Sequence, residues 1–316
     1  MTKTDAIMDC PMQNAEQTAA ELAHRVTNVT VIRCHEPLAK RTTLRVGGPA
    51  DLYVEPACEP DLAAVLAFCA ERGLKFFVLG RGSNVLVRDG GFRGVVVCLA
   101  HPHFSRVEID GERLGCGAGA KLKQVAVEAK RAGLSGVEFL EGIPGSVGGA
   151  LRMNAGAMGG STFDAVEKIR VMDHAGEVRE LSPVEMDIEY RCCPLLRTRV
   201  ALGAVFKCRP APREEIEQRM NAHSRKRWDS QPAAPSAGCM FKNPGTIPAG
   251  KLVDELGLKG AKVGGAMVSL EHGNFIVNDG TATARDVLEL VALIQKRAKA
   301  ERGIDLHMEV ELIGED

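Results

Sequence analysis

Three glycine-rich segments are the part of this sequence whose residue types and spacing point most directly to chemistry. They are Gly80-Arg81-Gly82-Ser83-Asn84, the run from Gly142 to Ala150, and the run from Asn154 to Gly160. Glycine loses more backbone entropy on folding than other residues, so loops this dense in glycine are hard to explain as turns alone. Free backbone amides in such loops can bind a pyrophosphate. The alternative explanation is that the loops pack closely against a sheet.

A fourth glycine motif, Gly115 to Gly119, precedes an amphipathic segment at 122–132 and invites comparison with the dinucleotide-binding Rossmann turn. That turn requires a parallel strand, a third glycine at the right offset and an acidic residue about 20 positions on. Here Asp110-Gly111 predicts an antiparallel hairpin between 106–109 and 112–116, and the glycines follow the pattern GxGxG. We therefore expect no nicotinamide-binding Rossmann unit at this motif.

The composition limits the classes of partner. The 316 residues are 45% apolar and can form roughly two or three domains with a sizeable core. The 40 basic and 41 acidic residues nearly cancel, so no global field attracts nucleic acid or an anionic membrane. Aromatic residues make up only 4%, with Trp228 the single tryptophan, which argues against stacking platforms for single-stranded nucleic acid. An anion must be bound by local groups.

Cysteine spacing and the N-terminus indicate the compartment. The 10 cysteines form no CxxC pair and have no histidine at a zinc-binding spacing, so no metal site is expected. The stretch from Met1 to Asn28 carries acidic residues and lacks the apolar core of a secretory signal. No run approaches the ~18 apolar residues that a membrane helix needs. We expect a cytoplasmic protein with reduced thiols.

Helices and strands alternate along the chain and must position these loops. Apolar residues at helical spacing predict helices, and short β-branched runs predict strands. Helices are expected at 15–25, 60–73, 122–132, 214–227, 251–256 and 284–302, and strands at 29–34, 51–54, 76–79, 85–87, 95–99, 106–109, 112–116, 169–173, 178–181, 201–208 and 307–313. Pro210 and Pro212 mark a domain boundary. The order of elements predicts an α+β protein.

Five segments taken together resemble one enzyme family. They are LGRGSN at 79–84, EGIPGSVGGALRMNAGA at 141–157, Tyr190-Arg191, PSAGCMFKNP at 235–244 and EVELIG at 309–314. With these motifs in this order, the chain from about Thr43 to Gly314 resembles the UDP-N-acetylenolpyruvoylglucosamine reductases.

The resemblance implies an FAD-binding fold of the vanillyl-alcohol-oxidase type with a third α+β substrate-binding domain. On that basis 1–100 is the first FAD-binding subdomain, 101–210 is the second, and 211–302 is the substrate-binding domain. The C-terminal strand at 303–316 is expected to join the second subdomain.

The implied activity is NADPH-dependent, FAD-mediated reduction of UDP-N-acetylglucosamine enolpyruvate to UDP-N-acetylmuramate. This reaction serves peptidoglycan synthesis, and with it cell wall biogenesis, cell shape and cell division. FAD is expected to bind non-covalently, with NADPH as co-substrate. The expected partners are therefore small molecules, with no nucleic acid, no membrane insertion and no obligate protein partner.

The resemblance also implies which residues hold the cofactor. The FAD-binding residues are expected in the glycine-rich loops: Gly80, Arg81, Gly82, Ser83, Asn84, Ile143, Pro144, Gly145, Ser146, Gly148, Gly149, Asn154, Ala155 and Gly156.

Three residues match the catalytic set of the family. Arg191 matches the arginine that stabilises charge on the substrate carboxylate, although an arginine here could also pair with a surface acid such as Glu189. Glu309 matches a C-terminal glutamate that helps to stabilise the enolate, and beside an anion its pKa should be raised. Glu311, expected on the same strand face, is its nearest rival.

The proton donor departs from the family pattern, because Cys239 stands where a serine is usual. A thiol, with an ordinary pKa of about 8.5, is the stronger acid and leaves a thiolate to be reprotonated. It would also open the site to alkylation and oxidation. Without its context, Cys239 would read as a small buried apolar residue.

The resemblance suggests substrate-binding roles for Tyr190, Lys242 and Asn243. The basic cluster Arg225-Lys226-Arg227 could reach the diphosphate or form a solvated helix face, and Gln231 and Asn274 are further plausible contacts. Some members of the family carry a tyrosine-bearing insertion over the nucleotide, but the 2 tyrosines here are Tyr53 and Tyr190. The chain therefore resembles the shorter subtype, and the uracil contact is unassigned.

Two other classes of protein fit parts of the pattern. One is an oxidase of sugars or hydroxy acids with the same flavin-binding fold, which would reduce oxygen rapidly. The other is a non-catalytic flavin or sugar-nucleotide binding protein that has lost its donor serine.

Overall fold

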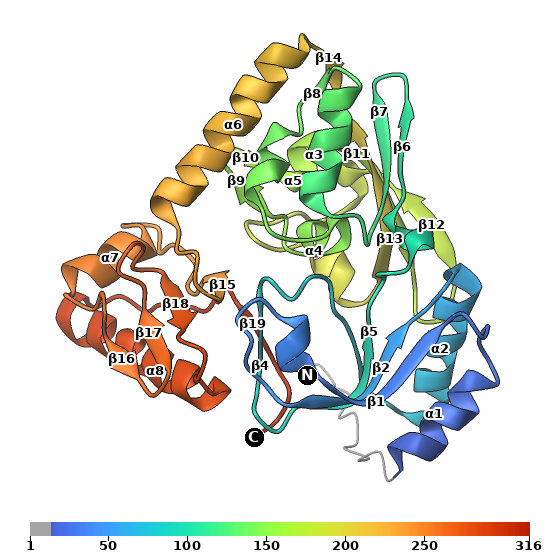
Figure 1. Ribbon diagram of the computed structural model, residues 1–316, viewed down its shortest axis with the longest axis horizontal. Helices are drawn as coiled ribbons and strands as arrows, with labels where there is room; N and C mark the ends of the chain where they lie inside the picture. Colours follow the sequence, from blue (N-terminus) through green and yellow to red (C-terminus); the bar gives the residue numbers. More distant parts are fainter. Residues whose placement is uncertain (1–13) are drawn as a thin grey trace.

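The computed structural model describes residues 14–316, arranged around three main sheets (Figure 1). Residues 1–13 of the expected first subdomain, and with them half of the stretch expected to lack a secretory signal, lie outside the described residues. In 14–316 no helix has both the length and the apolar character needed to cross a bilayer. The predicted α+β fold is confirmed, with helices and strands mixed in each part of the chain.

The first subdomain is a four-stranded sheet with strand order β1-β2-β5-β3. Its elements are α1(Ala15–Ala23), β1(Val31–Pro37), β2(Pro49–Glu55), α2(Glu59–Arg72), β3(Phe76–Val78) and β5(Phe92–Val97). Strand β5 pairs in parallel with β2 and β3, whereas β1 and β2 are antiparallel. Helix α2 buries Leu62, Val65, Leu66 and Cys69, and ends at Gly73, whose φ of 62° favours glycine. The predicted helix and strands are thus confirmed.

The second subdomain is an antiparallel sheet with strand order β12-β11-β13-β7-β6. Its strands are β6(Val107–Asp110), β7(Arg113–Gly117), β11(Val166–Met172), β12(Val178–Leu181) and β13(Val200–Lys207). The predicted hairpin at Asp110-Gly111 is confirmed, and β7 has only antiparallel neighbours, as the sequence predicted in place of a Rossmann unit. A Cβ on Gly117 would lie 2.1 Å from the Phe104 carbonyl oxygen, and one on Gly119 would lie 1.9 Å from that of Leu99. These glycines therefore permit close backbone packing.

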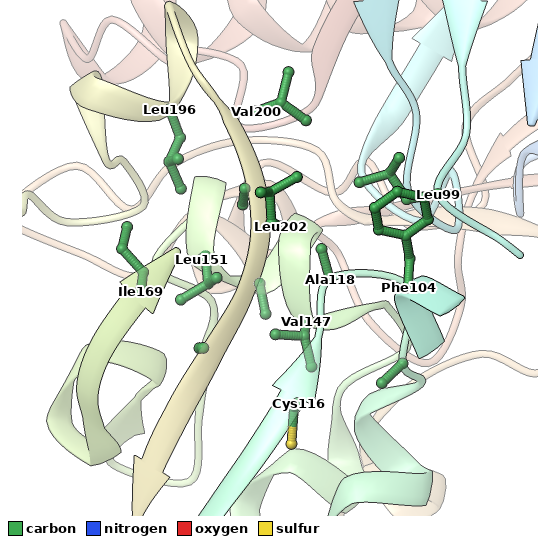
Figure 2. Packing of buried hydrophobic residues seen from close by; sticks show 14 of the residues in the cluster. Leu99, Phe104, Cys116, Ala118, Val147, Leu151, Ile169, Leu196, Val200 and Leu202 are labelled. Carbon is green, nitrogen blue, oxygen red and sulfur yellow. The ribbon is translucent and has the colours of Figure 1, made fainter. Parts of the chain in front are cut away.

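Two helices pack on this sheet and join the cores of the first two subdomains. They are α3(Leu122–Arg131) and α4(Val147–Arg152). Figure 2 shows Val147 and Leu151 of α4 facing the strand that carries Val200 and Leu202. All four side chains are nearly fully buried in one apolar cluster that also contains residues of the first sheet. The second glycine-rich loop, which runs into α4, is thereby anchored on this shared core.

The third domain is a four-stranded sheet with strand order β15-β18-β17-β16, covered by two helices. Its elements are β15(Ser236–Cys239), α7(Ala249–Glu255), β16(Lys262–Val263), β17(Ala266–Val268), β18(Phe275–Asn278) and α8(Ala284–Arg302). Helix α8 starts with a capping box at Thr283 and Asp286 and stops at Gly303, whose φ is 66°. The apolar cluster of this domain also includes Leu44, Val46 and Leu86 from the first 100 residues.

The remaining elements are the long helix α6(Arg213–Ser230) and a set of short segments. The short segments are η1(Leu38–Arg41), β4(Val85–Val87), η2(Pro102–Ser105), β8(Leu134–Ser135), η3(Glu138–Gly142), β9(Gly156–Ala157), β10(Gly160–Ser161), α5(Thr162–Ala165), η4(Pro183–Glu185), η5(Pro194–Arg197), β14(Arg209–Pro210) and β19(Glu311–Ile313).

The expected placement of the C-terminal strand in the second subdomain is wrong. Strand β19 pairs in parallel with β4, with Glu311 opposite Val85 and Ile313 opposite Val87. In the described residues β4 pairs with no other strand, so the tail supplies its one strand partner. The strand is also shorter than expected and begins only at Glu311, leaving Glu309 outside it.

Helix α6 also differs from the expected third domain at 211–302. Its buried side chains, Ile216 and Met220, belong to the core of the first two subdomains. Glu217 pairs with Lys130 at 2.9 Å, and Arg219 pairs with Glu138 at 3.0 Å. The helix therefore extends from the second subdomain toward the third domain (Figure 1).

Candidate active site

A cavity of about 1550 Å³ is lined by residues from all three parts of the molecule. The predicted cofactor-binding residues line it, with the exception of Asn154. Arg191, Cys239 and Glu309 line it as well, although they are far apart in the sequence. The cavity thus brings the glycine-rich loops and the predicted catalytic residues into one site.

The first glycine-rich loop combines close packing with free backbone donors. A Cβ on Gly80 would lie 2.9 Å from Ser146 Oγ in the second loop, and one on Gly82 would lie 2.4 Å from the Arg41 carbonyl oxygen. Within the described residues, the amides of 80–84 donate no hydrogen bond to the protein. Both explanations offered by the sequence therefore apply here, because the loop is tightly packed and still presents amides to the cavity.

Thr42 adds an unsatisfied polar group to the same wall. Its hydroxyl oxygen is buried and has no hydrogen-bond partner among residues 14–316, and the residue lines the cavity. Buried hydroxyls are normally hydrogen-bonded, so an unpaired one here suits a bound polar ligand. A phosphate-bearing cofactor as large as FAD fits this combination of cavity size, amides and hydroxyl.

A tight turn at 189–192 carries Arg191. Glu189 and Cys192 exchange backbone hydrogen bonds of 2.9 and 3.3 Å, and Arg191 takes a left-handed φ of 56°. The Asn154 side chain donates to the Glu189 carbonyl oxygen at 3.2 Å and accepts from the Phe163 amide at 3.3 Å. Asn154 therefore supports the turn from outside the cavity.

The Arg191 guanidinium is held at two of its nitrogens. Nε lies 3.2 Å from Glu309 Oε1, and Nη2 donates to the Gly156 carbonyl oxygen at 3.0 Å. A Cβ on Gly156 would lie 3.0 Å from Nη1 and 2.6 Å from the Gly160 carbonyl oxygen, so glycine leaves room for the guanidinium. The alternative partner Glu189 is not the carboxylate that Arg191 meets.

Backbone contacts join the segments that carry Cys239 and Glu309. The Glu309 amide donates to the Met240 carbonyl oxygen at 2.8 Å, and the Asn84 side chain donates to the Glu309 carbonyl oxygen at 3.1 Å. Asn84 also accepts the Glu311 amide at 3.0 Å through its own carbonyl. The end of the first glycine-rich loop thereby fixes the position of Glu309.

Asn274 fixes the segment that carries Cys239, as Asn84 fixes the segment that carries Glu309. Its side chain is buried, accepts from the Phe241 amide at 2.9 Å and donates to the Phe241 carbonyl oxygen at 2.8 Å. Its carbonyl oxygen accepts from the Met240 amide at 2.8 Å. With these bonds Asn274 fixes the residues that follow Cys239, and its side chain also hydrogen-bonds with the Cys239 thiol.

Burial changes the acidity of two groups in the site. It raises the pKa of the Cys239 thiol to about 12, with the nearby Glu309 carboxylate adding to the rise. Burial also raises the pKa of Glu309, as the sequence predicted. The positive charges of Arg191 and Lys242 oppose this rise. Cys239 is therefore protonated at neutral pH, and its small thiolate fraction makes it less open to alkylation than the ordinary thiol pKa suggested.

The predicted substrate-binding residues lie at the edge of the site. Tyr190, Lys242 and Asn243 do not line the cavity. Lys242 is close enough to Glu309 to influence its pKa, and the Arg191 guanidinium lies 5.2 Å from the Tyr190 ring centroid. The Asn243 side-chain oxygen accepts from the Ala249 amide at 2.9 Å at the start of α7. Within residues 14–316, Asn243 is the one of the three whose side chain forms a hydrogen bond with the protein.

Sequence reasoning missed Arg152 and assigned Glu311 only as a rival to Glu309. Arg152 Nη2 lies 2.5 Å from Glu311 Oε1, and Nε lies 3.2 Å from Oε2. Both residues line the cavity. The position of Arg152 between two glycine-rich loops could have pointed to it as a site residue. Its partner Glu311 is 159 positions away, and no local sequence pattern identifies that partner.

Comparison with known proteins gives concordant matches. Residues 50–182 match the model of the FAD binding domain family, and residues 231–313 match that of the UDP-N-acetylenolpyruvoylglucosamine reductase C-terminal domain. The UDP-N-acetylenolpyruvoylglucosamine reductase of Heliobacterium modesticaldum is 45% identical over 283 residues, covering 89% of this chain and 90% of that protein. That of Bacillus subtilis is 40% identical, covering 95% and 99%. The crystal structure of the reductase from Thermus caldophilus, 41% identical, has a TM-score of 0.78 and covers 90% of this chain and 99% of its own.

Proposed function

Because the chain belongs to the UDP-N-acetylenolpyruvoylglucosamine reductase family, we propose that it reduces UDP-N-acetylglucosamine enolpyruvate to UDP-N-acetylmuramate. NADPH is the reductant and FAD is the bound cofactor, which makes the protein a UDP-N-acetylmuramate dehydrogenase. The observation that supports this function best is the convergence of Arg191, Cys239 and Glu309 on the cavity that also contains the glycine-rich loops.

The loops of the first two subdomains would hold FAD. Their free amides at 80–84 and the unpaired Thr42 hydroxyl suit its diphosphate and other polar groups. When bound, FAD supplies the hydride-carrying ring that this chain's own side chains lack.

Arg191 and Glu309 would stabilise the substrate as its double bond is reduced. Hydride addition at the terminal carbon of the enolpyruvyl group leaves negative charge that spreads into the neighbouring carboxylate. The Arg191 guanidinium keeps its charge at working pH and can bond a carboxylate through parallel N–H groups. Glu309 orients the guanidinium by its 3.2 Å contact. Burial raises the pKa of the Glu309 carboxyl, so it would accept a proton more readily than an exposed glutamate and could then donate to the enolate.

Cys239 would supply the proton that completes the reduction. The thiol breaks its S–H bond and the proton forms a C–H bond at the carbon next to the carboxylate, leaving a thiolate that solvent reprotonates. Its pKa of about 12 keeps the proton in place until the carbanion forms. An enolate is a much stronger base than water, so a weakly acidic thiol still suffices.

Tyr190, Lys242 and Asn243 are the proposed contacts of the sugar nucleotide outside the cavity wall. Lys242, near Glu309, is the best placed of them to attract the substrate carboxylate or diphosphate. With this substrate, the protein acts in the cytoplasm in peptidoglycan precursor synthesis, and through it in cell shape and division.

An anaerobic spectral titration tests the proposed function. Added NADPH should bleach the yellow flavin band of the purified protein, and added UDP-N-acetylglucosamine enolpyruvate should restore it without oxygen. Bleaching without return would reject this substrate and favour an oxidase of the same fold. A folded protein without bound flavin would contradict the cofactor as well.

A further inference from the structure

Trp228 is an exposed aromatic side chain in a place where exposure needs an explanation. It is the only tryptophan of the chain, lies near the end of α6, and is 61% exposed. It lines the cavity, which none of the other large exposed apolar side chains of residues 14–316 does. Large aromatic residues gain most when they are covered, so an open one in a ligand cavity indicates a surface that the ligand covers.

The residues around Trp228 add positive charge to this surface. The Arg227 guanidinium lies 5.4 Å from the Trp228 ring centroid, and Arg227 lines the cavity as well. Arg225 and Lys226 precede it on the same helix and are exposed. No salt bridge involves these three basic residues within the described part of the chain. Of the three, Arg227 is the one that lines the cavity beside the ring, and an aromatic ring next to this cation suits a ligand with both a flat ring and a phosphate group.

The position of α6 explains why the ring is open. Its buried residues are Ile216 and Met220, both in its first half, so the second half leaves the core of the second subdomain. Figure 1 shows this end of α6 reaching toward the third domain. The two tyrosines do not offer an alternative ring, because Tyr53 is buried and Tyr190 does not line the cavity.

We propose that the base of a nucleotide diphosphate stacks on the open part of the Trp228 ring, with Arg227 beside it to attract the diphosphate. The inference rests on the proposed function for the identity of the ligand. Two ligands of that reaction share this chemistry, the uridine diphosphate of the substrate and the nucleotide half of NADPH. Trp228 would thus provide the base contact that the chain's tyrosines do not.

Binding of UDP and NADP⁺, measured by calorimetry on the flavin-loaded protein, tests the stacking directly. Trp228→Leu keeps an apolar side chain without a ring, and Trp228→Phe keeps a ring. Val184→Ala, which changes an exposed apolar residue outside the cavity, serves as the matched control. Because stacking on a protein aromatic typically accounts for about tenfold or more in affinity, Trp228→Leu should weaken at least one nucleotide by on the order of tenfold. Trp228→Phe should recover most of that loss.

A ligand without a base separates stacking from charge. Inorganic pyrophosphate should bind wild type and Trp228→Leu equally, whereas Arg227→Gln should weaken it. A loss confined to UDP assigns the stack to the uracil ring, and a loss confined to NADP⁺ assigns it to the dinucleotide. Unchanged affinity for both nucleotides in Trp228→Leu, equal losses in Val184→Ala, or no binding of either nucleotide to wild type would overturn the proposal.

Steady-state kinetics distinguish this inference from the proposed function. In Trp228→Leu, KM for the affected nucleotide should rise by the same factor while kcat stays within about twofold, because the ring does not touch the reacting atoms. A wild-type protein that binds UDP through Trp228 but does not turn over would reject the proposed function and leave the stacking intact.

Discussion

Two arginine–glutamate pairs line the same cavity, and they differ in how completely their hydrogen-bonding groups are used. Arg152 engages all three of its side-chain nitrogens, two with Glu311 and one with the Leu196 carbonyl oxygen. In the described residues Arg191 bonds through Nε and Nη2 only. The pair with spare donors is the one that can bind a substrate carboxylate.

The backbones of the two pairs differ in the same direction. Arg152 ends a regular helix and Glu311 starts a strand, whereas Arg191 takes a left-handed conformation in a turn and Glu309 lies outside any strand. Residues held in sparsely populated conformations are common at active sites, where surrounding structure must maintain them. These differences support the proposal that Arg191–Glu309 serves the reaction, whereas Arg152–Glu311 joins the second subdomain to the C-terminal tail.

Replacing each of the two arginines with glutamine tests this difference most strongly. Arg191→Gln should slow reoxidation of the reduced flavin by substrate by about 10³-fold, because a preorganised donor to the developing charge is lost. Arg152→Gln should slow it by less than about tenfold. Stopped-flow absorbance in the flavin band measures both rates, and similar losses in the two variants would remove the distinction.

The two glutamates should differ less, because Glu309 acts partly through Arg191. Glu309→Ala should lower the reoxidation rate by about 10²-fold, and Glu309→Gln by less, since its amide keeps a donor. Glu311→Ala is the matched control, two positions away, and should change this rate by less than about threefold. A larger loss in Glu311→Ala than in Glu309→Ala would make Glu311 the catalytic residue.

The structural role of Arg152–Glu311 should appear in stability. Arg152→Met should lower the free energy of unfolding by about 2 kcal/mol, because it removes charge-assisted bonds at a half-buried position. The exposed pair Arg179–Glu177 provides the control, and Arg179→Met should leave stability unchanged within error. Urea unfolding checks both, and an unchanged midpoint for Arg152→Met would reject the joining role.

A smaller expected difference between the pairs lies in how the stability of the protein depends on pH. Burial raises the pKa of Glu309 in the folded protein, so between the ordinary glutamate pKa and this raised value the folded state binds more protons than the unfolded state. The stability of the wild-type protein should therefore fall as pH rises through that range, and the stability of the Glu309→Gln variant should fall less. Urea midpoints at several pH values measure the slopes. Equal slopes would show that Glu309 is not perturbed in the folded protein.

Much of this fold follows from local sequence signals. The turn dipeptide Asp110-Gly111 predicted the antiparallel hairpin, and Gly73 and Gly303 mark the ends of α2 and α8. The pairing of β19 with β4 was not predictable, because alternation identifies a strand but not its partner across more than 200 residues. The charged sequence of α6 likewise gave no indication that its first half packs on the second subdomain through Ile216 and Met220 and pairs with it through Glu217 and Arg219.

The candidate site likewise contains residues that the sequence predicted and residues whose roles it did not. Arg191, Cys239 and Glu309 were predicted from motifs, and the structure brings them to one cavity. The supporting residues were not predicted in their roles. Asn154 and Asn84 were assigned to the cofactor, yet their side chains hold the segments that carry Arg191 and Glu309. Those roles depend on contacts between distant segments, which motifs do not record.

Cys239 is the proposed proton donor at the site that it forms with Arg191 and Glu309. The most direct measurement is the anaerobic rate at which substrate reoxidises the NADPH-reduced flavin in Cys239→Ala, with Cys239→Ser as the matched variant that restores a hydroxyl donor. We expect flavin reduction by NADPH to be unchanged in both variants. Reoxidation should fall by about 10³-fold in Cys239→Ala and by less than about tenfold in Cys239→Ser. Reoxidation of Cys239→Ala at the wild-type rate would contradict the claim.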